Sequence, residues 1–141
     1  MRNKVLYISA FLFIGLILFQ ACSNEQELNY QRYFVNGKGL YEKNCQNCHG
    51  AEGEGLGRLY PPLTDTVSLS KNKSILACII KNGLSEKADA HDVSYETEMP
   101  GNASLPDIDI AQIIVYVTNS FGNKQGFYDQ MEVTSDLKGC D

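Results

Sequence analysis

The stretch "KNCQNCHG", residues 43–50, places two cysteines three positions apart and a histidine directly after the second one. Paired cysteines of this kind serve a redox-active disulfide, a zinc site or a covalently attached haem. The residues at issue are Cys45, Cys48 and His49. The rest of the chain has to decide which of the three chemistries they carry.

The redox and zinc interpretations both leave the histidine unexplained. A thioredoxin-like pair lies at a helix start after a strand in an α/β pattern, and no such pattern surrounds Cys45. The spacing of Cys45 and Cys48 suits a zinc site. However, His49 directly follows Cys48, so two adjacent side chains would have to point at one small ion. The ligands needed to complete a zinc site would come from Cys78, His91 or Cys140.

Covalent haem attachment uses all three residues, because Cys-x-x-Cys-His is the signature of a c-type haem. Each thiol, of Cys45 and of Cys48, adds to one vinyl group of the porphyrin, and the imidazole of His49 then reaches the iron from one face. A chance match in a chain of this composition is expected only about 0.002 times. We therefore expect one covalently bound haem c with His49 as an axial ligand of the iron.

A six-coordinate iron needs a second axial ligand, for which the candidates are Met99, His91 and Met131. Met99 lies in "TEMPGN", a polar loop ended by proline, where core filling explains a methionine poorly. A thioether ligand raises the reduction potential relative to two histidines. His91, in "KADAHDVS", is more simply an exposed loop residue. We expect Met99 to be the ligand.

Periodicity predicts an all-α domain with long loops. Residues 34–46 form a short helix leading into the cysteine pair, and residues 50–62, with four glycines and two prolines, form a loop. A second helix covers residues 72–83, with Asn72 as its cap and Gly83 as its stop. Residues 84–105 have no clear period and are read as loop. The strongest helix covers 106–121, and the tail after it is loop with at most a short helical turn.

At these residues the chain resembles a class I c-type cytochrome, from about Val35 to Gly122. The resemblance implies a small helical domain wrapped around one haem, here residues 34–122, with residues 123–141 as a C-terminal extension packed on it. Gly37 and Tyr41 match the glycine and aromatic that let the first helix cross the last, and Ile113 and Tyr116 match the contacts from the last helix.

The same resemblance assigns the residues around the haem. "YPPL" matches a loop in which a proline carbonyl, here that of Pro61, accepts a hydrogen bond from the imidazole of His49, with Leu63 on the haem face. "MPG" matches the loop of the sixth ligand, Met99. The chain departs from the family pattern at Pro106, where a Ser or Thr cap is usual before the last helix, and in having Cys78.

The N-terminus predicts export and anchoring. Arg2 and Lys4 precede an apolar run of 15 residues, which is shorter than the roughly 20 that a spanning helix needs. "FQAC" resembles the lipobox of bacterial lipoproteins, although ordinary signal-peptide cleavage near Ala21 would also fit this sequence. We expect residues 1–21 to be a signal peptide, Cys22 to be lipidated, and residues 22–33 to be a polar tether to a membrane on the periplasmic side of a bacterial cell envelope.

Charge and the remaining cysteines complete the prediction. Loss of Arg2 and Lys4 with the leader changes the net charge from −5 to −7, which disfavours nucleic acid and favours a basic or mixed protein surface. Once lipid and haem are assigned, Cys78 and Cys140 remain. Outside the cytoplasm such a pair forms a disulfide, the alternative being two buried thiols.

The predicted function is electron transfer rather than enzyme catalysis, with no small-molecule substrate. The partners expected from the resemblance are redox proteins such as a respiratory complex and a terminal oxidase. The alternative is a haem enzyme or gas sensor in which Met99 leaves or never binds the iron.

Overall fold

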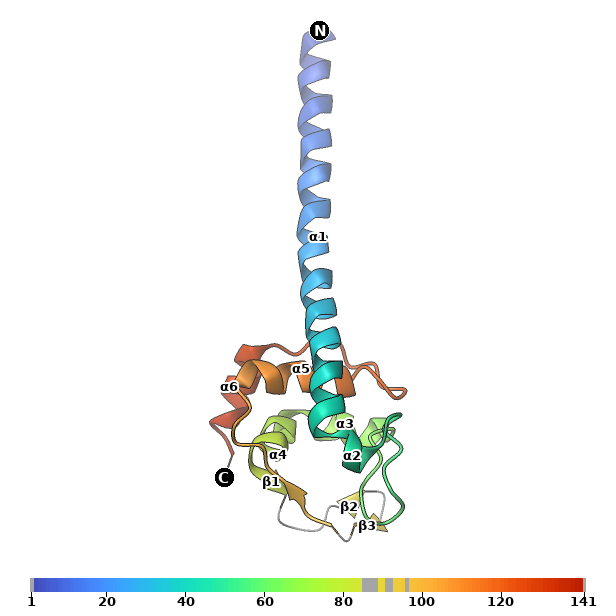
Figure 1. The fold of residues 1–141 in the computed structure, drawn as a ribbon. Coiled ribbons are helices and arrows are strands. Elements are labelled where there is room, and N and C mark those ends of the chain that lie inside the picture. Colours follow the sequence, from blue (N-terminus) through green and yellow to red (C-terminus); the bar gives the residue numbers. More distant parts are fainter. Residues whose placement is uncertain (1, 85–88, 91–92, 96, 141) are drawn as a thin grey trace. The chain divides into compact units, whose positions relative to one another are not determined.

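The computed structural model describes residues 2–84, 89–90, 93–95 and 97–140. The chain divides into two units, Met1–Arg32 and Tyr33–Asp141. Helix α1 runs from one into the other, and every further element belongs to the second unit (Figure 1). The elements in order are α1 (Arg2–Asn44), α2 (Gln46–His49), α3 (Thr66–Lys71), a 3-10 turn η1 (Lys73–Ile75), α4 (Leu76–Asn82), β1 (Gly83–Leu84), β2 (Asp89–Ala90), β3 (Val93–Ser94), β4 (Met99–Pro100), α5 (Asp107–Val117) and α6 (Gln130–Leu137).

The first unit is helical over its described residues. Residues 22–33, the predicted tether, continue α1 without a break, and the Gln31 side chain donates a 2.7 Å hydrogen bond to Glu27 one turn earlier. This segment contains several good helix formers and no glycine or proline. Among the described residues, no helix combines the length and the apolar character needed to span a bilayer.

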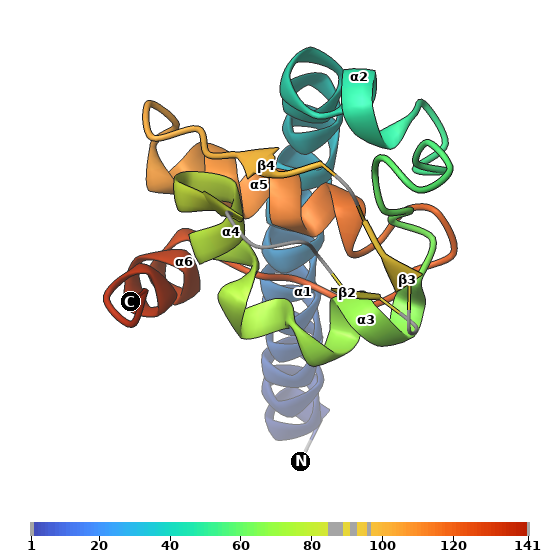
Figure 2. The same ribbon diagram turned by 90° about the horizontal axis from the view of Figure 1, so that it is seen from below.

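Helix α5 lies at the centre of the second unit. Six of its apolar side chains are at most 6% exposed, and α5 packs on both α4 and α6. Figure 2 shows α4 beside α5, with α6 next to them. The most buried apolar residues of α5 are Ile110, Ala111, Ile113, Ile114, Val115 and Val117. The apolar face of the predicted helix 106–121 therefore forms the core of the domain up to Val117.

The last turns of the predicted helix 106–121 are not helical. The helix ends at Val117 because side chains from the following loop bind its final carbonyl groups. The side-chain Nδ2 of Asn119 donates to Val115 O at 2.8 Å, and Nδ2 of Asn123 donates to Val117 O at 3.2 Å. Phe121 then takes a φ of +57°, in the left-handed region. The prediction that Phe121 belongs to the helix was wrong.

The close crossing of α1 and α5 depends on Gly37. A Cβ atom at this position would lie 1.9 Å from Gln112 O and 2.9 Å from Tyr116 Cβ, so any larger residue would force the helices apart. The Tyr116 ring packs beside this crossing, with its centroid 5.3 Å from Phe34 and 5.3 Å from Tyr41. The crossing holds residues 33–44 of α1 against the core.

The middle of the chain differs from the prediction in two places and agrees with it in a third. Asn72 does not cap the second helix with its side chain, which instead donates to Ser68 Oγ at 3.4 Å. Helix α3 was not predicted. It begins at Asp65, whose carboxylate accepts from Ser68 N at 3.0 Å. Gly83, with φ +83°, ends α4 as predicted.

The segment predicted as loop from 84 to 105 contains short strands. β1 pairs antiparallel with β4, and β2 pairs antiparallel with β3. Each strand is two residues long, which is too short for alternation to be visible in the sequence.

The tail forms a two-turn helix, α6, where only a helical turn was expected. It starts with a capping box. The Asp129 carboxylate accepts from Glu132 N at 2.9 Å, and the Glu132 carboxylate accepts from Asp129 N at 2.8 Å. Val133 buries its side chain completely. Helix α5, in contrast, starts at Pro106 without a side-chain cap, as the missing Ser or Thr indicated.

Candidate haem site

The two cysteines and the histidine of the motif lie on a single helical turn. α1 ends at Asn44, and Cys45 occupies the N-cap position of α2. The backbone N–H groups of Cys48 and His49 donate to Cys45 O at 3.1 and 3.0 Å, and Gly50, with φ +85°, ends the turn. This turn points Cys45, Cys48 and His49 toward one cavity.

The His49 ring is held in one tautomer. Its Nδ1 lies 3.0 Å from the carbonyl oxygen of Pro61, and only 8% of the residue is exposed. A carbonyl oxygen only accepts, so Nδ1 carries the proton and Nε2 keeps its lone pair. Burial lowers the pKa of His49, and the hydrogen bond to Pro61 opposes that effect. The histidine is thus prepared to bind a metal as a neutral imidazole.

Tyr41 braces the same turn from α1. It is 1% exposed, and its hydroxyl donates a 2.6 Å hydrogen bond to Gly50 O. Burial raises the pKa of Tyr41, and the nearby Cys45 adds to the effect. Phe121 closes the other side, with its ring centroid 5.4 Å from that of Tyr41. The end of α2 is therefore fixed by a buried aromatic cluster.

Cys45 and Cys48 are free, half-buried thiols. Burial, followed by the neighbouring Cys48, raises the pKa of Cys45 to about 11. Helix α1, not a strand, leads into the pair, which is unlike the thioredoxin arrangement. No cluster of three or more metal-binding side chains occurs among the described residues.

Cys78 and Cys140 form a disulfide, with their Cα atoms 5.6 Å apart. This bond links α4 to the residues after α6 and removes both sulfurs as zinc ligands. His91, the other candidate for a zinc ligand, lies outside the described residues. The zinc interpretation thus has no support in the described part of the chain.

The cavity is a mostly apolar space of about 320 Å³. Its walls come from α2, the loop containing Pro61 and Leu63, α3, α4, β4 and α5. Apolar lining with a few placed polar groups is typical of a cofactor site. The apolar lining residues include Leu63, Leu69, Leu76, Ile79, Ile80, Ile113 and Val117. Two thiols, one imidazole, one thioether and an apolar wall are the groups that a covalently bound haem requires, so these residues fit that cofactor.

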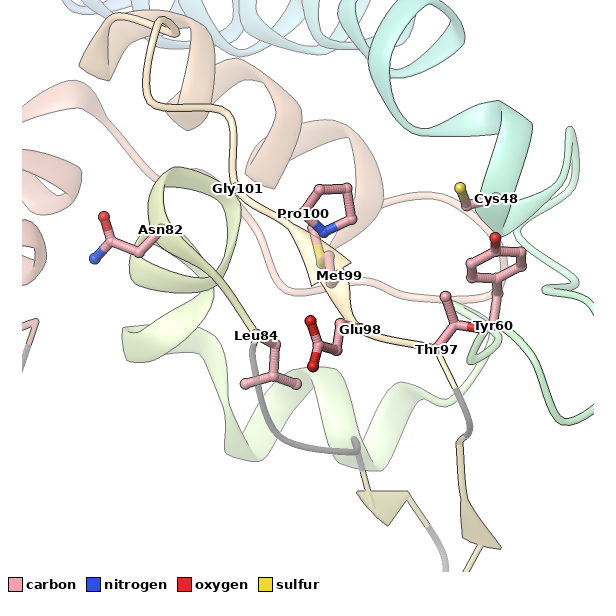
Figure 3. A pocket seen from close by; sticks show the side chains of 9 residues that line it. All are labelled: Cys48, Tyr60, Asn82, Leu84, Thr97, Glu98, Met99, Pro100 and Gly101. Carbon is pink, nitrogen blue, oxygen red and sulfur yellow. The ribbon is translucent and has the colours of Figure 1, made fainter.

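Met99 lines the cavity from β4. It also borders a second, more open hollow of about 550 Å³ that Cys48 and Tyr60 line as well. Figure 3 shows Met99 on β4 and Cys48 on α2, with Tyr60 and Thr97 between the two elements. His49 and Met99 therefore border one cavity from different elements. Met131 is 76% exposed on α6 and borders neither hollow.

The residues that sequence reasoning missed are the apolar side chains of the cavity wall. Leu69 belongs to the unpredicted helix α3, and Ile79 and Ile80 lie within the predicted helix 72–83, for which no role in the cavity was expected. Asp65 three positions before Ser68 is a capping signal that could have revealed α3. Ile75, Leu76, Ile79 and Ile80 recur at helical spacing, so the sequence shows this apolar face of the predicted helix but not that it lines a cavity.

The cytochrome c family model matches residues 34–120, more than half of the chain. The chain belongs to the cytochrome c family. With this membership, the all-α fold, a class I c-type cytochrome domain and haem c as cofactor are confirmed.

Curated relatives of this cytochrome c domain include subunits of larger enzymes. The cytochrome c subunit of a quinone alcohol dehydrogenase from Gluconacetobacter polyoxogenes is 32% identical over 92 residues, 64% of this chain and 19% of that protein. The fructose dehydrogenase cytochrome subunit of Gluconobacter japonicus is 33% identical over 95 residues, 64% of this chain and 20% of that protein. The chain thus spans about a fifth of these relatives.

A relative of more similar size is cytochrome c-552 of Thermus thermophilus. It is 26% identical over 93 residues, which are 63% of this chain and 70% of that protein. The matched region of this cytochrome c thus corresponds to most of a small cytochrome as well as to part of a larger subunit.

Proposed function

We propose that this chain is an electron carrier with one haem c, attached through Cys45 and Cys48 and ligated by His49 and Met99. The observation that carries the proposal is the single cavity that these four side chains line together. The sequence contains one Cys-x-x-Cys-His motif, which fits a single haem. Bound haem supplies a ferrous–ferric couple that exchanges one electron at a time.

The protein's own residues set the conditions for that exchange. The hydrogen bond from Nδ1 of His49 to Pro61 O directs Nε2 to the metal and fixes the ring. The apolar wall, including Leu63 and Ile113, keeps water from the cavity. The Met99 thioether favours the ferrous state relative to a second histidine. No general acid or base is needed.

The electron-transfer proposal is tested by a potentiometric titration of the full chain with its haem, combined with a pyridine haemochrome assay. The expected results are one haem per chain, two thioether links, a single one-electron Nernst curve and slow CO binding to the reduced protein. Fast CO binding would favour the alternative of a gas sensor or haem enzyme with an open sixth site. Absence of haem would overturn the proposal.

We further propose that Cys22 carries lipid after removal of residues 1–21, and that residues 22–33 tether the domain to a membrane on the periplasmic side. This rests on the "FQAC" sequence and on the charged, apolar leader. In fractionated cells, Cys22→Ala is expected to move the haem protein from the membrane to the soluble fraction. An unchanged distribution would contradict the lipid anchor.

The partners we propose are other redox proteins, a membrane dehydrogenase or respiratory complex as donor and a terminal oxidase as acceptor. Two of the relatives above are cytochrome subunits of dehydrogenases. The acidic net charge of −5 favours a partner with a basic or mixed surface. Electron exchange with such a partner should then slow as ionic strength rises, because salt screens the attraction. An unchanged rate would argue against charge-guided docking.

A further inference from the structure

The strand that carries Met99 lies against the C-terminal end of α4. In the antiparallel pair of β1 and β4, Gly83 faces Pro100 and Leu84 faces Met99. β1 directly follows α4, so this two-residue strand links the position of Met99 to that helix. Figure 3 shows Met99 and Pro100 on β4 and Gly101 directly after it, with Asn82 and Leu84 on the neighbouring segment.

Two glycines bring these backbones into direct contact. A Cβ atom on Gly83 would lie 2.5 Å from Met99 O and 2.6 Å from the backbone nitrogen of Gly101. A Cβ atom on Gly101 would lie 2.4 Å from the carbonyl carbon of Asn82 and 2.7 Å from Gly83 N. All of these neighbours are backbone atoms, which cannot rotate away as the end of a side chain can.

Hydrogen bonds fix the chain that follows Met99 to the same helix. The backbone N–H of Asn102 donates to Ile80 O at 2.9 Å, and Lys81 Nζ donates to Leu105 O at 2.6 Å. Ile80 is also part of the cavity wall. Helix α4 thus forms one wall of the haem cavity and anchors the Met99 segment at the same time.

We propose that Gly83 and Gly101 are positioning residues that set the distance of the Met99 sulfur from the iron. The proposal rests on the proposed role of Met99 as the sixth ligand. Non-bonded carbon atoms lie about 3.5–4.0 Å apart, so a methyl group at either position would separate α4 and β4 by roughly 1 Å. The side chains of a binding site must stay within about 0.5 Å of their productive positions. The Met99–iron bond therefore requires glycine at both positions.

The first test compares Gly101→Ala with Gly39→Ala in the full-length protein with its haem. A Cβ atom on Gly39, on α1, would have no neighbour within 4 Å, whereas the one on Gly101 would meet Asn82. Gly101→Ala is expected to lose most of the far-red methionine–iron charge-transfer band and to bind CO quickly when reduced, with its covalent haem retained. Gly39→Ala should match the wild type.

The second test uses the other side of the contact and controls for the positive φ of the glycine. Gly83 and Gly126 have φ values of +83° and +78°, but a Cβ atom on Gly126 would have no neighbour within 4 Å. Alanine is strained at both positions because both φ values are positive, and Gly83, with a ψ of −174°, lies in a region that glycine almost alone adopts. Only Gly83→Ala is expected to weaken the far-red band and lower the reduction potential. If Gly101→Ala fails to fold, the comparison of Gly83→Ala with Gly126→Ala still tests the proposal.

The outcomes separate this proposal from the one on which it rests. A wild-type protein with the far-red band, whose Gly83→Ala and Gly101→Ala variants keep both the band and the potential, would overturn the positioning role and leave Met99 as the ligand. A wild-type protein without the band would overturn both. Loss of the band in both variants, with the Gly39→Ala and Gly126→Ala controls unchanged, is the expected result.

Discussion

The two sides of the haem cavity are built by different means. The proximal side, which we define as Tyr41 and residues 45–61, is held by side-chain hydrogen bonds to nearby carbonyl groups, from Tyr41 to Gly50 and from His49 to Pro61. The distal side, which we define as α4, β1 and residues 99–102, is held by contact between backbones and by the bond from Asn102 to Ile80. These two proximal hydrogen bonds span at most 12 residues, whereas the Gly83–Met99 contact spans 16 residues.

This difference indicates how each side responds to change. The proximal side keeps its histidine 8% exposed, and Tyr41 of the aromatic cluster holds the end of the turn, so single substitutions there should leave the attachment turn in place. On the distal side, the side-chain hydrogen bonds from Lys81 to Leu105 O and from Asn102 to Asn44 Oδ1 involve neighbours of Met99, and the methionine itself is only half-buried. The following predictions test this contrast, from the largest expected effect to the smallest.

Replacing both attachment cysteines should remove covalent haem entirely. In Cys45→Ser/Cys48→Ser, no thioether bond can form, so acidified acetone should extract all of the haem. The matched control is Cys78→Ser/Cys140→Ser, which removes the two cysteines that form the disulfide and should keep its haem covalently bound. Haem that resists extraction from the Cys45/Cys48 variant would contradict the assignment.

Replacing the distal methionine should open the iron while leaving the proximal side intact. Met99→Ala is expected to lose the far-red band, to bind CO rapidly when reduced and to show a lower reduction potential, because the thioether no longer favours the ferrous state. Met131→Ala is the control, since Met131 is 76% exposed and borders neither hollow. If the two variants gave the same spectrum, Met99 would not be the ligand.

Removing the disulfide should destabilise the distal side through α4. The bond joins residues separated by 62 positions, and the chain-entropy model gives about 4 kcal/mol for a loop of that size. We expect Cys78→Ser/Cys140→Ser to lower the urea midpoint and to weaken the far-red band before the α2 segment unfolds. Circular dichroism and absorbance in one titration measure both changes. An unchanged midpoint would show that α6 does not stabilise α4.

Removing one proximal hydrogen bond should have the smallest effect. Tyr41→Phe keeps the ring but loses the hydrogen bond to Gly50 O, at a cost of about 1 kcal/mol. The far-red band should remain, because His49 and Pro61 are untouched. Tyr33→Phe keeps the ring contact with Phe127 and is the control. Loss of the band in Tyr41→Phe would refute the view that the proximal side is the more robust one.

The sequence predicted the proximal side better than the distal side for a physical reason. Cys45, Cys48 and His49 lie in one turn, so their relation is local, and "YPPL" follows within the same loop. The short strands β1 and β4 could not be predicted, because two-residue strands show no alternation. The close approach of Gly83 and Gly101 depends on tertiary contact between distant segments.

The helices show the same division between local and long-range causes. The apolar face of α5 was evident from its spacing, but its end at Val117 depends on Asn119 and Asn123, whose side chains fold back onto it. Helix α6 was missed although its signal was local, since Asp129 and Glu132 form a capping box.

The most direct test of the central claim is the far-red absorption spectrum of the oxidised full-length protein, followed by CO addition to the reduced form. The account predicts a methionine–iron charge-transfer band and no rapid CO binding, because it proposes His49 and Met99 as the two axial ligands. A spectrum without that band, together with rapid formation of a CO complex, would contradict it.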